Sequence, residues 1–487
     1  MTIVLLFLAV GLNAQYVSTL RVTNETTAFG TAISQGMQIF NTYNNELYVA
    51  EYAFSSGATL TTAADSVKLI VDYDRLTDNY LSMFQGVRWN KNDDTYQRTG
   101  SLIDIAVSQS AGNANLPVHS QMKRCVLDDY GIVQYYVDAD NPTYQDGSTT
   151  LTVDYTGGDG QVMVQTQKFY YRVEFTVQGD YYWSVSLYHL PGFTLHPAFF
   201  KDGQEVNYRY FSAFEGSMYD ASAGAMTASG SITTSLYSTG DIMCSVSNQW
   251  AKTNEQRSEY RSMAAQRGEG WRQLDWTLNS AVQLLFLVEY ANFNTQSMIG
   301  NGRTDLSGGS WTADSYIGKT GLSISDGNGT NSVSNGGTSG YLTDYMTYRG
   351  IENWYGNVWK MFDGITWDGR WTGTAAAQPV YYTNNSEYFK DTGSDNMRFL
   401  TDASYIGTSA GYITDFENTF VFIPSAVGGS SLVYDYYYQY SESSRDYWRV
   451  PLVGGSATHG GQAGGFALGA YAAWSLGNSS FGARLCF

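Results

Sequence analysis

Apolar and polar residues alternate through the first half of the chain. The runs QVMVQTQKFYYRVEFTV (residues 161–177) and DYYWSVSLYHL (residues 180–190) change character at nearly every second position, a period typical of half-buried β-strands. Turn sequences separate such runs, among them GGDG at residues 157–160 and the Asp202-Gly203 dipeptide, which favours a tight hairpin. Residues 20–84 show shorter alternations broken by Asn, Gly and Ser. The pattern predicts β modules throughout this half.

The period changes after Asn248, and two helices are predicted. Residues 253–268 (TNEQRSEYRSMAAQRG) begin with a capping residue, carry acidic residues early and arginines late, and end at a glycine. Residues 272–290 follow, and their centre, AVQLLFLVEY, is apolar on nearly every side, which indicates a buried helix. Beyond Gly300 the chain is rich in Gly, Ser and Asn, so long loops and short strands are expected, with FGARLCF as the last strand.

These elements predict an α+β fold class and four segments. A length of 487 residues exceeds one ordinary core and suggests two or three domains. The predicted segments are an apolar N-terminal stretch (1–19), a small β attachment module (20–89), a β-rich spacer domain (90–241) and a C-terminal domain that holds both helices (242–487).

The first residues, MTIVLLFLAVGLNAQ, form an apolar run that is too short to cross a membrane as a helix. The small residues around Ala14 are typical of the cleavage site of a secretory signal. The run lacks the Lys or Arg that normally precedes such a signal. Two interpretations therefore stay open, a secretory signal and a buried assembly or anchoring segment.

Composition narrows the classes of partner. Asp and Glu outnumber Lys and Arg by 45 to 27, which argues against nucleic acid because phosphate contacts need clustered basic residues. The 40 tyrosines suit exposed recognition surfaces, although tyrosine also favours strands. The three cysteines and four histidines are scattered and give neither a disulfide framework nor metal-ligand spacing. We therefore expect no cofactor and no metal.

The end of the chain has an unusual composition. Residues 448–487 contain no Lys, Asp or Glu, and Arg449 and Arg484 are their only full charges. Glycine and alanine fill the segment, with single aromatic residues set among them. Glycine permits tight turns without any demand from a side chain, so the segment reads as a backbone frame that carries isolated side chains.

Two motifs in the second half resemble a known family. The sequence YRGIENWYGNVWKMFDG (residues 348–364) resembles the GNVWEW segment of the C-type-lectin-like fold in its formylglycine-generating-enzyme-like form, with Lys360 and Met361 departing from it. The chain's close, from Gly454-Gly455-Ser456 to Gly482-Ala483-Arg484, resembles that family's GGSW…GFR ending, with Ala457 in place of Trp. The resemblance implies β-rich N-terminal modules followed by a C-type-lectin-like domain with two helices, short strands and long loops.

The whole chain also resembles tail proteins of gut phages. The similarity runs from GQVMVQTQKFYYRVEF through LPGFTLHPAFFKDGQEV and GEGWRQLDW to GARLCF. In many such proteins the last segment is the variable region of a diversity-generating retroelement, which writes random residues at template adenines. The resemblance implies a homotrimeric, extracellular fibre of the virion tail, joined to other tail proteins, that binds a bacterial surface glycan or protein receptor. It places the variable segment at about residues 445–482.

A variable surface needs two interleaved classes of residue, one that holds the backbone and one that projects outward. The expected frame positions are Gly454, Gly455, Gly460, Gly464, Gly465, Phe466, Gly482, Ala483 and Arg484. The expected receptor-binding residues, called display positions below, are Tyr447, Thr458, His459, Gln462, Gly469, Tyr471, Trp474, Leu476, Asn478 and Ser480. In the alternative interpretation, Tyr471 and Trp474 lie on one face of a helical turn and belong to the core.

Enzyme activity is not expected. GTSAG (residues 407–411) matches a nucleophile elbow at Ser409, followed by Asp415, Asp435 or Asp446 and then His459. That motif needs a strand before it, a helix after it and an α/β sheet around it, and the pattern here predicts neither βα alternation nor a helix after Ser409. A polysaccharide depolymerase would use a pair of carboxylates, and no motif selects a pair among the acidic residues. A tail-associated depolymerase and a secreted or surface-anchored bacterial adhesin remain the alternatives to a tail fibre.

Overall fold

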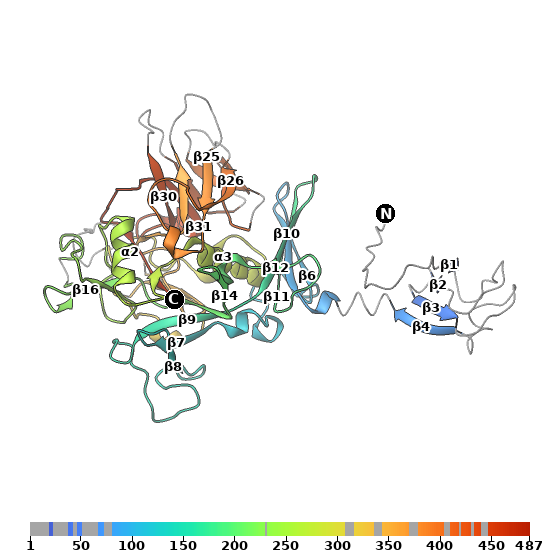
Figure 1. Cartoon of the computed structure of the whole chain (residues 1–487), viewed down its shortest axis with the longest axis horizontal. Coiled ribbons are helices and arrows are strands. Elements are labelled where there is room, and N and C mark those ends of the chain that lie inside the picture. Colours follow the sequence, from blue (N-terminus) through green and yellow to red (C-terminus); the bar gives the residue numbers. More distant parts are fainter. Residues whose placement is uncertain are drawn as a thin grey trace. The chain divides into compact units, whose positions relative to one another are not determined.

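The computed structural model describes most of the chain. The described residues are 80–228, 231–306, 316–335, 343–369, 378–403, 410–417, 420–429, 433–439 and 447–487, together with the strands 19–22, 38–41, 46–50 and 67–72. The chain divides into two units, residues 1–83 and 84–487 (Figure 1). Residues 1–18, which hold the predicted signal or assembly segment, lie outside the described residues.

The first unit contains one four-stranded sheet within the predicted attachment module. Its order is β1-β2-β3-β4, with β1 parallel to β2 and the other pairs antiparallel. The strands are β1 (Thr19–Val22), β2 (Gln38–Asn41), β3 (Glu46–Ala50) and β4 (Val67–Asp72).

The alternating runs of the first half form antiparallel strands, as predicted. A five-stranded sheet has the order β12-β10-β11-β5-β6. Its strands are β5 (Gln85–Asn90), β6 (Thr95–Gly100), β10 (Tyr170–Phe175), β11 (Asp180–Ser186) and β12 (Thr194–Leu195). The predicted hairpin pairs β13 (Phe200–Lys201) with β14 (Gln204–Glu205). Its turn residues Asp202 and Gly203 have φ of 50° and 81°, the positive values of a type I′ turn.

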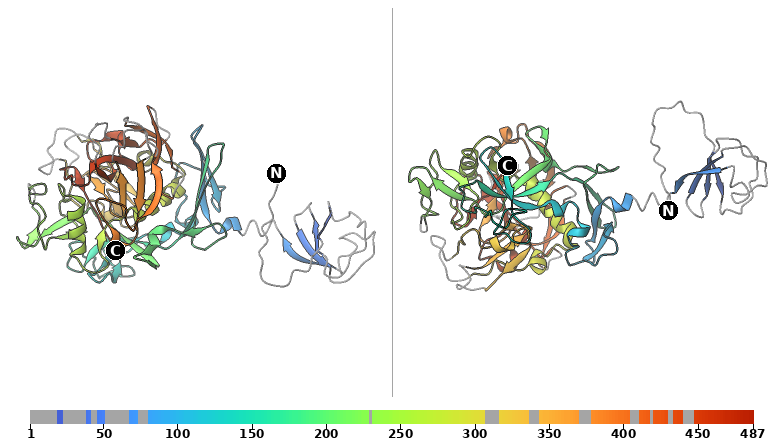
Figure 2. Two further views of the ribbon diagram at one scale, coloured as in Figure 1. Left: turned by 45° about the horizontal axis from the view of Figure 1, so that its top comes forward. Right: turned by 90° about the horizontal axis from the view of Figure 1, so that it is seen from below.

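A six-stranded sheet takes the end of the chain as an inner strand. Its order is β19-β33-β15-β9-β7-β8, and β33 pairs antiparallel with both neighbours. The strands are β7 (Lys123–Leu127), β8 (Val133–Tyr136), β9 (Gln161–Gln167), β15 (Tyr208–Ser212), β19 (Arg272–Gln273) and β33 (Leu485–Cys486). The right-hand view of Figure 2 shows the C-terminus over these strands. The sheet therefore joins strands from both sides of residue 242.

The two predicted helices are present, with shifted starts. Helix α2 (Arg257–Ala265) begins after Gln256, which forms a capping box with Glu259. Helix α3 (Trp276–Tyr290) begins after Asp275 rather than at Arg272, because Arg272 and Gln273 pair with β33, and all of its residues are buried. Helix α4 (Thr295–Ile299) was not predicted, since one turn is too short to show a period. Among the described residues, none of the helices has both the length and the apolar character that a bilayer crossing requires.

The remaining strands form two three-stranded sheets and one ten-stranded sheet. The small sheets are β17-β16-β18, from β16 (Ser217–Asp220), β17 (Ala225–Met226) and β18 (Ile242–Cys244), and β20-β21-β22, from β20 (Asn331–Val333), β21 (Tyr345–Tyr348) and β22 (Ile351–Glu352). The large sheet has the order β26-β25-β24-β30-β31-β29-β27-β28, and β23 joins it by pairing with β30 and β32.

The strands of the large sheet all come from the last third of the chain. They are β23 (Trp359–Met361), β24 (Ile365–Asp368), β25 (Gln378–Tyr382), β26 (Arg398–Ala403), β27 (Gly411–Phe416), β28 (Pro424–Gly428), β29 (Tyr436–Tyr438), β30 (Trp448–Gly454), β31 (Gly464–Ala473) and β32 (Phe481–Gly482). Short 3-10 turns complete the unit at η2 (Asn113–Asn115), η3 (His119–Gln121), η4 (Pro197–Phe199), η5 (Ile324–Asp326), η7 (Ser386–Tyr388) and η8 (Gly460–Gln462). The β-rich α+β class with few helices is confirmed.

One aromatic core joins the two halves of the second unit. Phe293, just after α3, packs its ring 5.1 Å from Trp89 and 5.7 Å from Trp183 of the five-stranded sheet. The same ring lies 4.9 Å from Phe466 of β31 in the large sheet. Edge-on aromatic pairs of this kind add stability beyond the area they bury. The predicted spacer and the C-terminal domain thus share a core.

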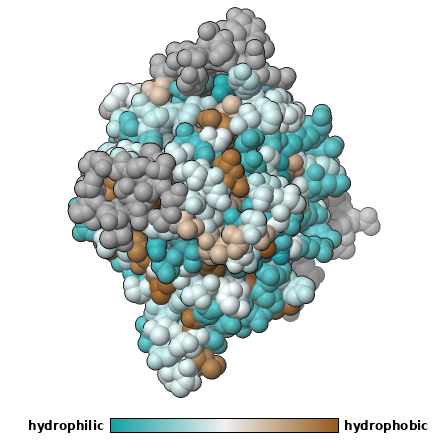
Figure 3. Space-filling model, turned by 90° about the vertical axis from the view of Figure 1, so that its left-hand side faces the viewer, coloured by the Kyte–Doolittle hydropathy of each residue, from teal (hydrophilic) through white to brown (hydrophobic). Residues whose placement is uncertain are grey.

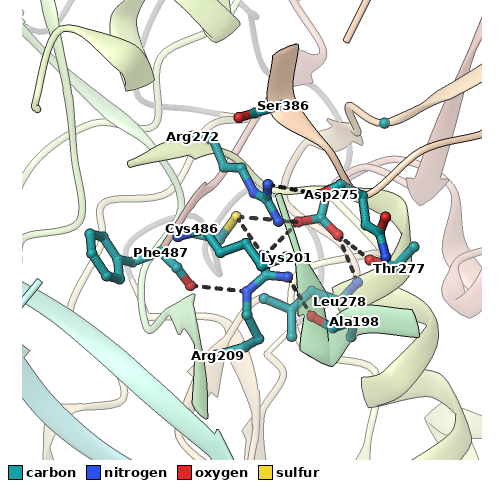
Figure 4. A network of polar contacts seen from close by, with 12 residues as sticks. Ala198, Lys201, Arg209, Arg272, Asp275, Thr277, Leu278, Ser386, Cys486 and Phe487 are labelled. Carbon is teal, nitrogen blue, oxygen red and sulfur yellow. Dashed lines mark hydrogen bonds and ion pairs between the residues drawn. The ribbon is translucent and has the colours of Figure 1, made fainter. Parts of the chain in front are cut away.

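A buried ion-pair cluster fixes the end of the chain to the start of α3 (Figure 4). The carboxylate of Asp275 is fully buried, lies 2.6 Å from Arg209 Nη2 and 3.0 Å from Arg272 Nη2, and accepts a hydrogen bond from the Leu278 N–H. Arg209 also donates to the carbonyl oxygen of Phe487 at 3.1 Å. Burial alone would raise the pKa of Asp275, but the two guanidinium groups outweigh it and hold the pKa well below its usual range.

Exposed hydrophobic side chains of the second unit are spread over several elements. Examples are Tyr130, Val177 and Leu236, which lie far apart in the sequence. On the face shown in Figure 3, hydrophobic residues form small groups between hydrophilic ones. Scattered apolar residues of this kind are normal on a protein surface and need no partner to explain them.

The substitution Asp275→Asn should destabilise the fold strongly. Asn keeps the helix cap but removes the countercharge of buried Arg209 and leaves buried Arg272 with the partly exposed Asp202 alone, and a broken buried pair costs about 3–5 kcal/mol. Chemical denaturation measures the free energy of unfolding. The control is Glu205→Gln, which removes the half-exposed carboxylate paired with Lys168 and should change stability by less than about 1 kcal/mol. Equal effects of the two substitutions would contradict this account.

Candidate binding surface

The last 40 residues of the chain, 448–487, are called the closing segment below. The segment is built on the antiparallel pair β30 and β31 near the middle of the large sheet. Close approach fixes the glycines at the start of β31. A Cβ atom at Gly464 would lie 2.0 Å from Asp435 Oδ1, and one at Gly465 would lie 2.3 Å from the Trp354 ring. Gly454 and Gly455 have φ of 97° and 74°, which disfavour any other residue. Eight of the nine frame positions are buried, and Gly460 is half-buried.

Arg484 anchors the far end of the segment. Its guanidinium is buried and donates to the carbonyl oxygens of Ser212 at 3.1 Å, of Asn353 at 2.8 Å, and of Glu352. Burial lowers the pKa of Arg484 to about 10, which leaves it charged at neutral pH. Charged donors on several carbonyls hold a backbone more firmly than neutral ones.

The GNVWKM motif forms a second buried anchor. Asn357, at φ 55°, accepts a hydrogen bond from the Gly318 N–H at 2.7 Å and donates to the carboxylate of Glu215. Lys360, one of the two residues that depart from the family pattern, is buried with its Nζ 3.1 Å from the same carboxylate. Burial lowers the pKa of Lys360 to about 8, against the opposing effect of Glu215. Lys360 therefore neutralises a buried acid that lies almost 150 residues earlier in the chain.

The display positions lie at different depths. Tyr447, Thr458, Leu476 and Asn478 are exposed, with 47% of Tyr447 and 37% of Leu476 open to solvent. The half-buried ones are His459, Gln462, Tyr471, Trp474 and Ser480. Gly469 is buried. Tyr471 lies in strand β31 and not in the helical turn of the alternative interpretation, but both Tyr471 and Trp474 are half-buried and pack one side against the core, as that interpretation expected in part.

Four display positions meet around a tyrosine from another strand. β29 runs parallel to β31 and pairs Tyr438 with Gly469. The Tyr438 ring lies 5.2 Å from His459 and 6.5 Å from Tyr471, and its hydroxyl donates to Gln462 Oε1. A Cβ atom at Gly469 would lie 2.8 Å from the Tyr471 ring. Gly469 thus leaves the space that this ring fills.

Further tyrosines extend the cluster across the sheet. Tyr436 lies 4.5 Å from Tyr438, and its register partner Tyr412 on β27 lies 5.2 Å from it, centroid to centroid. Buried Trp359 and Phe481 lie beneath the rings of Tyr438 and Tyr471. We call the half-buried residues Tyr412, Tyr436, Tyr438, His459, Gln462 and Tyr471 the tyrosine face. The sequence did not predict Tyr412, Tyr436 and Tyr438 as part of this surface, although the run YDYYYQY (residues 434–440) contains the last two.

The tyrosine face is uncharged at neutral pH. Burial raises the pKa of Tyr438 and Tyr471, which keeps both hydroxyls protonated. Burial lowers the pKa of His459 to about 4, and its Nδ1 accepts a hydrogen bond from the Ser456 N–H at 3.2 Å. A surface without charges loses little on leaving water, whereas an unpaired charge costs several kcal/mol at an interface. The face therefore suits desolvated contact.

The remaining display positions lie in turns beside the sheet. Tyr447 precedes β30, and Arg449 lies 5.9 Å from its ring. The Trp474 N–H donates to the Trp448 carbonyl at 3.1 Å, and Leu476 follows in the same turn. Asn478 Oδ1 accepts hydrogen bonds from the backbone and hydroxyl of Ser480. Thr458 lies beside His459, before η8. These residues precede β30, connect β30 to β31, or follow β31 along the chain, and they are not part of the tyrosine face.

The described residues of the hydrolase motif have other partners. Ser409 and Asp446 lie outside the described residues. Asp415 accepts a hydrogen bond from the Tyr181 hydroxyl at 2.8 Å and pairs with Lys91, and Asp435 accepts from the Phe466 N–H at 2.7 Å. In the described ranges, no three or more His, Cys, Asp or Glu side chains gather as a metal site would require.

Comparison with known proteins gives matches among solved structures alone. No protein-family model and no curated protein matches the chain. The chain is similar to solved structures titled Major Tropism Determinant P3c Variant and Major Tropism Determinant U1 Variant. Each alignment covers 96% of this chain and 98% of the other at 11% identity, with TM-scores of 0.24 and 0.25. Scores this low establish no residue correspondence, and the surface described above stands on the contacts of this chain.

The packing of the frame predicts that alanine at Gly464 lowers the stability of the fold, whereas alanine at Gly461 leaves it unchanged. Gly464→Ala places a methyl group against the buried Asp435 carboxylate and should cost about 3 kcal/mol. Gly461→Ala is the matched control, because Gly461 is exposed and a Cβ there would meet nothing within 4 Å. It should change the free energy of unfolding by less than about 0.5 kcal/mol. A neutral Gly464→Ala variant in denaturant melts would show that the frame is not tightly packed.

Proposed function

We propose that this chain is a receptor-binding protein of a phage tail, which attaches to a bacterial cell surface through the tyrosine face and the exposed display positions. One observation carries the proposal. The closing segment has a buried, glycine-rich frame, and all its display positions except the buried Gly469 carry exposed or half-buried side chains without charge, Tyr471 on strand β31 and the others in the turns beside the sheet. Such an arrangement separates what folds the segment from what the segment contacts.

The chemistry of the surface supports recognition by contact. Tyrosine presents a large amphipathic ring with few rotatable bonds, so it loses little entropy on binding. Each well-placed aromatic anchor can contribute about 1 kcal/mol or more. The rings of Tyr438 and Tyr471 rest on Trp359 and Phe481. A ring whose position is fixed before binding adds affinity because its ordering is already complete.

The proposal assigns roles to the rest of the chain. The four-stranded N-terminal module attaches the protein to other tail proteins, and the described sheets of the second unit carry the binding surface outward. We place the protein on the virion tail as a homotrimer. Three linked copies raise the effective concentration of each face at the cell surface, so a weak contact per copy suffices.

Binding should depend on the display positions and not on exposed tyrosine or leucine in general. Tyr471→Ala and Leu476→Ala should each lower the apparent affinity of the labelled protein for its host strain about tenfold or more. Flow cytometry over a panel of gut bacterial strains measures binding. Tyr208→Ala and Leu236→Ala are matched controls, because Tyr208 and Leu236 are 44% and 57% exposed and lie outside the segment.

Thermal melting separates loss of contact from loss of fold. The melting temperature of Leu476→Ala should stay close to that of the parent, since Leu476 lies in a turn and is 37% exposed. Equal binding by display and control variants would contradict the proposal. So would a large drop in melting temperature in Leu476→Ala, which would place the residue in the core.

The neighbouring DNA provides a test of diversification that needs no protein. A near-copy of the codons for about residues 445–482, with adenines at the codons of the display positions, should lie beside a reverse-transcriptase gene. Sequencing of sibling phages should then show substitutions at the display positions and none at the frame positions. A locus without the near-copy would contradict the proposal of diversification. It would not bear on receptor binding, which the cell-binding assay tests.

A further inference from the structure

A polar pocket lies across the η8 turn from the tyrosine face. Gly461 and Ala463 line it, whereas Gln462 between them accepts a hydrogen bond from Tyr438 on the tyrosine face. The turn therefore separates two surfaces. The pocket holds about 300 Å³ and is lined by Asn294, Gln296, Ser297, Asn301, Tyr434, Asp435, Gly461 and Ala463. None of these is a display position.

The lining has a consistent chemistry. It offers three side-chain amides, one serine hydroxyl, one phenol and one carboxyl, and no Lys, Arg or His among its described residues. Amides and carboxyls pair with hydroxyl groups as donors and acceptors. An anionic ligand would find no cation among these lining residues. A neutral molecule rich in hydroxyl groups matches the set, and the volume is at the small end of ligand pockets.

Tyr434 is strained at the edge of the pocket. Its φ is 67°, although it has a bulky side chain, and 47% of the residue is exposed. Such a backbone costs about 1–3 kcal/mol and persists where the surroundings require it. The strained backbone places an aromatic ring at the pocket, where the C–H groups of a sugar ring can pack on an aromatic face.

The pocket walls are fixed by bonds within the protein. Gln296 Nε2 donates to the carbonyl oxygens of Gly460 at 2.8 Å and Ala463 at 2.6 Å, which holds the η8 turn. Asp435 is held by the Phe466 N–H, and Asn294 accepts from the Ser297 N–H at 2.9 Å. A pocket that is already ordered loses little entropy when a small ligand enters.

We infer that this pocket binds one neutral pyranose unit, with the sugar ring against Tyr434 and its hydroxyl groups on the side-chain amides of Asn294 and Asn301. The site is distinct from the tyrosine face and stands whether or not that face binds a receptor. Where both act, the pocket holds a sugar of the cell-surface glycan while the tyrosine face contacts the structure around it.

Saturation-transfer NMR on the full chain tests the inference with free sugars. The probes are D-glucose, D-galactose, L-rhamnose and N-acetyl-D-glucosamine, and N-acetylneuraminic acid is the anionic comparison. At least one neutral sugar should show transfer, and the anionic sugar should show less. Tyr434→Gly should reduce the transfer about five- to tenfold through loss of ring stacking, while Tyr434→Phe should retain it.

The variants should keep the fold, so a loss of saturation transfer reports a loss of sugar binding. Glycine tolerates a φ of 67°, so Tyr434→Gly should keep or raise the melting temperature. Asn301→Ala, at an exposed position, should also weaken transfer. Tyr438→Ala should leave sugar binding unchanged, which separates this pocket from the receptor proposal. No transfer from any neutral sugar, or undiminished transfer in Tyr434→Gly, would overturn the inference.

Discussion

The buried ion pairs of Asp275 with two arginines hold the last strand of the chain in the six-stranded sheet. Asp275 caps helix α3 and binds Arg209 of β15 and Arg272 of β19. Those two strands flank β33, the last strand of the chain. The cluster therefore joins an early strand, the central helix and the final residues at a single point. Because its charges are fully buried, it is favourable only when all the partners are present.

Buried polar contacts also join distant parts of the chain near the closing segment. Glu215 binds Asn357 and Lys360, and Arg484 crosses to the carbonyl of Ser212. Both contacts tie residues of the predicted spacer to residues of the predicted C-terminal domain. Buried polar groups thus hold the end of the closing segment, at Arg484, and also strand β23, which pairs with β30 at the start of that segment. Stability is concentrated away from the surface that we propose for binding.

Much of the fold could be predicted from the sequence, because it depends on local signals. Alternation of apolar and polar residues predicted the strands, Asp202-Gly203 predicted the hairpin, and a run that is apolar on nearly every side predicted α3. The start of α3 could not be found, since Arg272 and Gln273 have helical neighbours but pair with a strand more than two hundred residues later. The family pattern left Lys360 as an unexplained departure, and only its contact with Glu215 explains it.

The site was predictable in part for the same reason. The alternation of glycines and isolated large residues marked the closing segment, but the tyrosines opposite it come from β27 and β29, and the parallel pairing of β29 with β31 has no local signature. Which residues share a face across a sheet depends on register. Composition showed an excess of tyrosine without showing where it gathers.

The identity of the frame has a consequence at the level of the genetic code. Its residues are glycine, alanine, phenylalanine and arginine. Every glycine, alanine and phenylalanine codon lacks adenine in its first and second letters, as do the arginine codons that begin with cytosine. A writing process that acts on adenines alone passes over such codons. Packing against Asp435 and Trp354 requires glycine at positions 464 and 465. Glycine codons are also ones that such a process cannot change into codons for another residue.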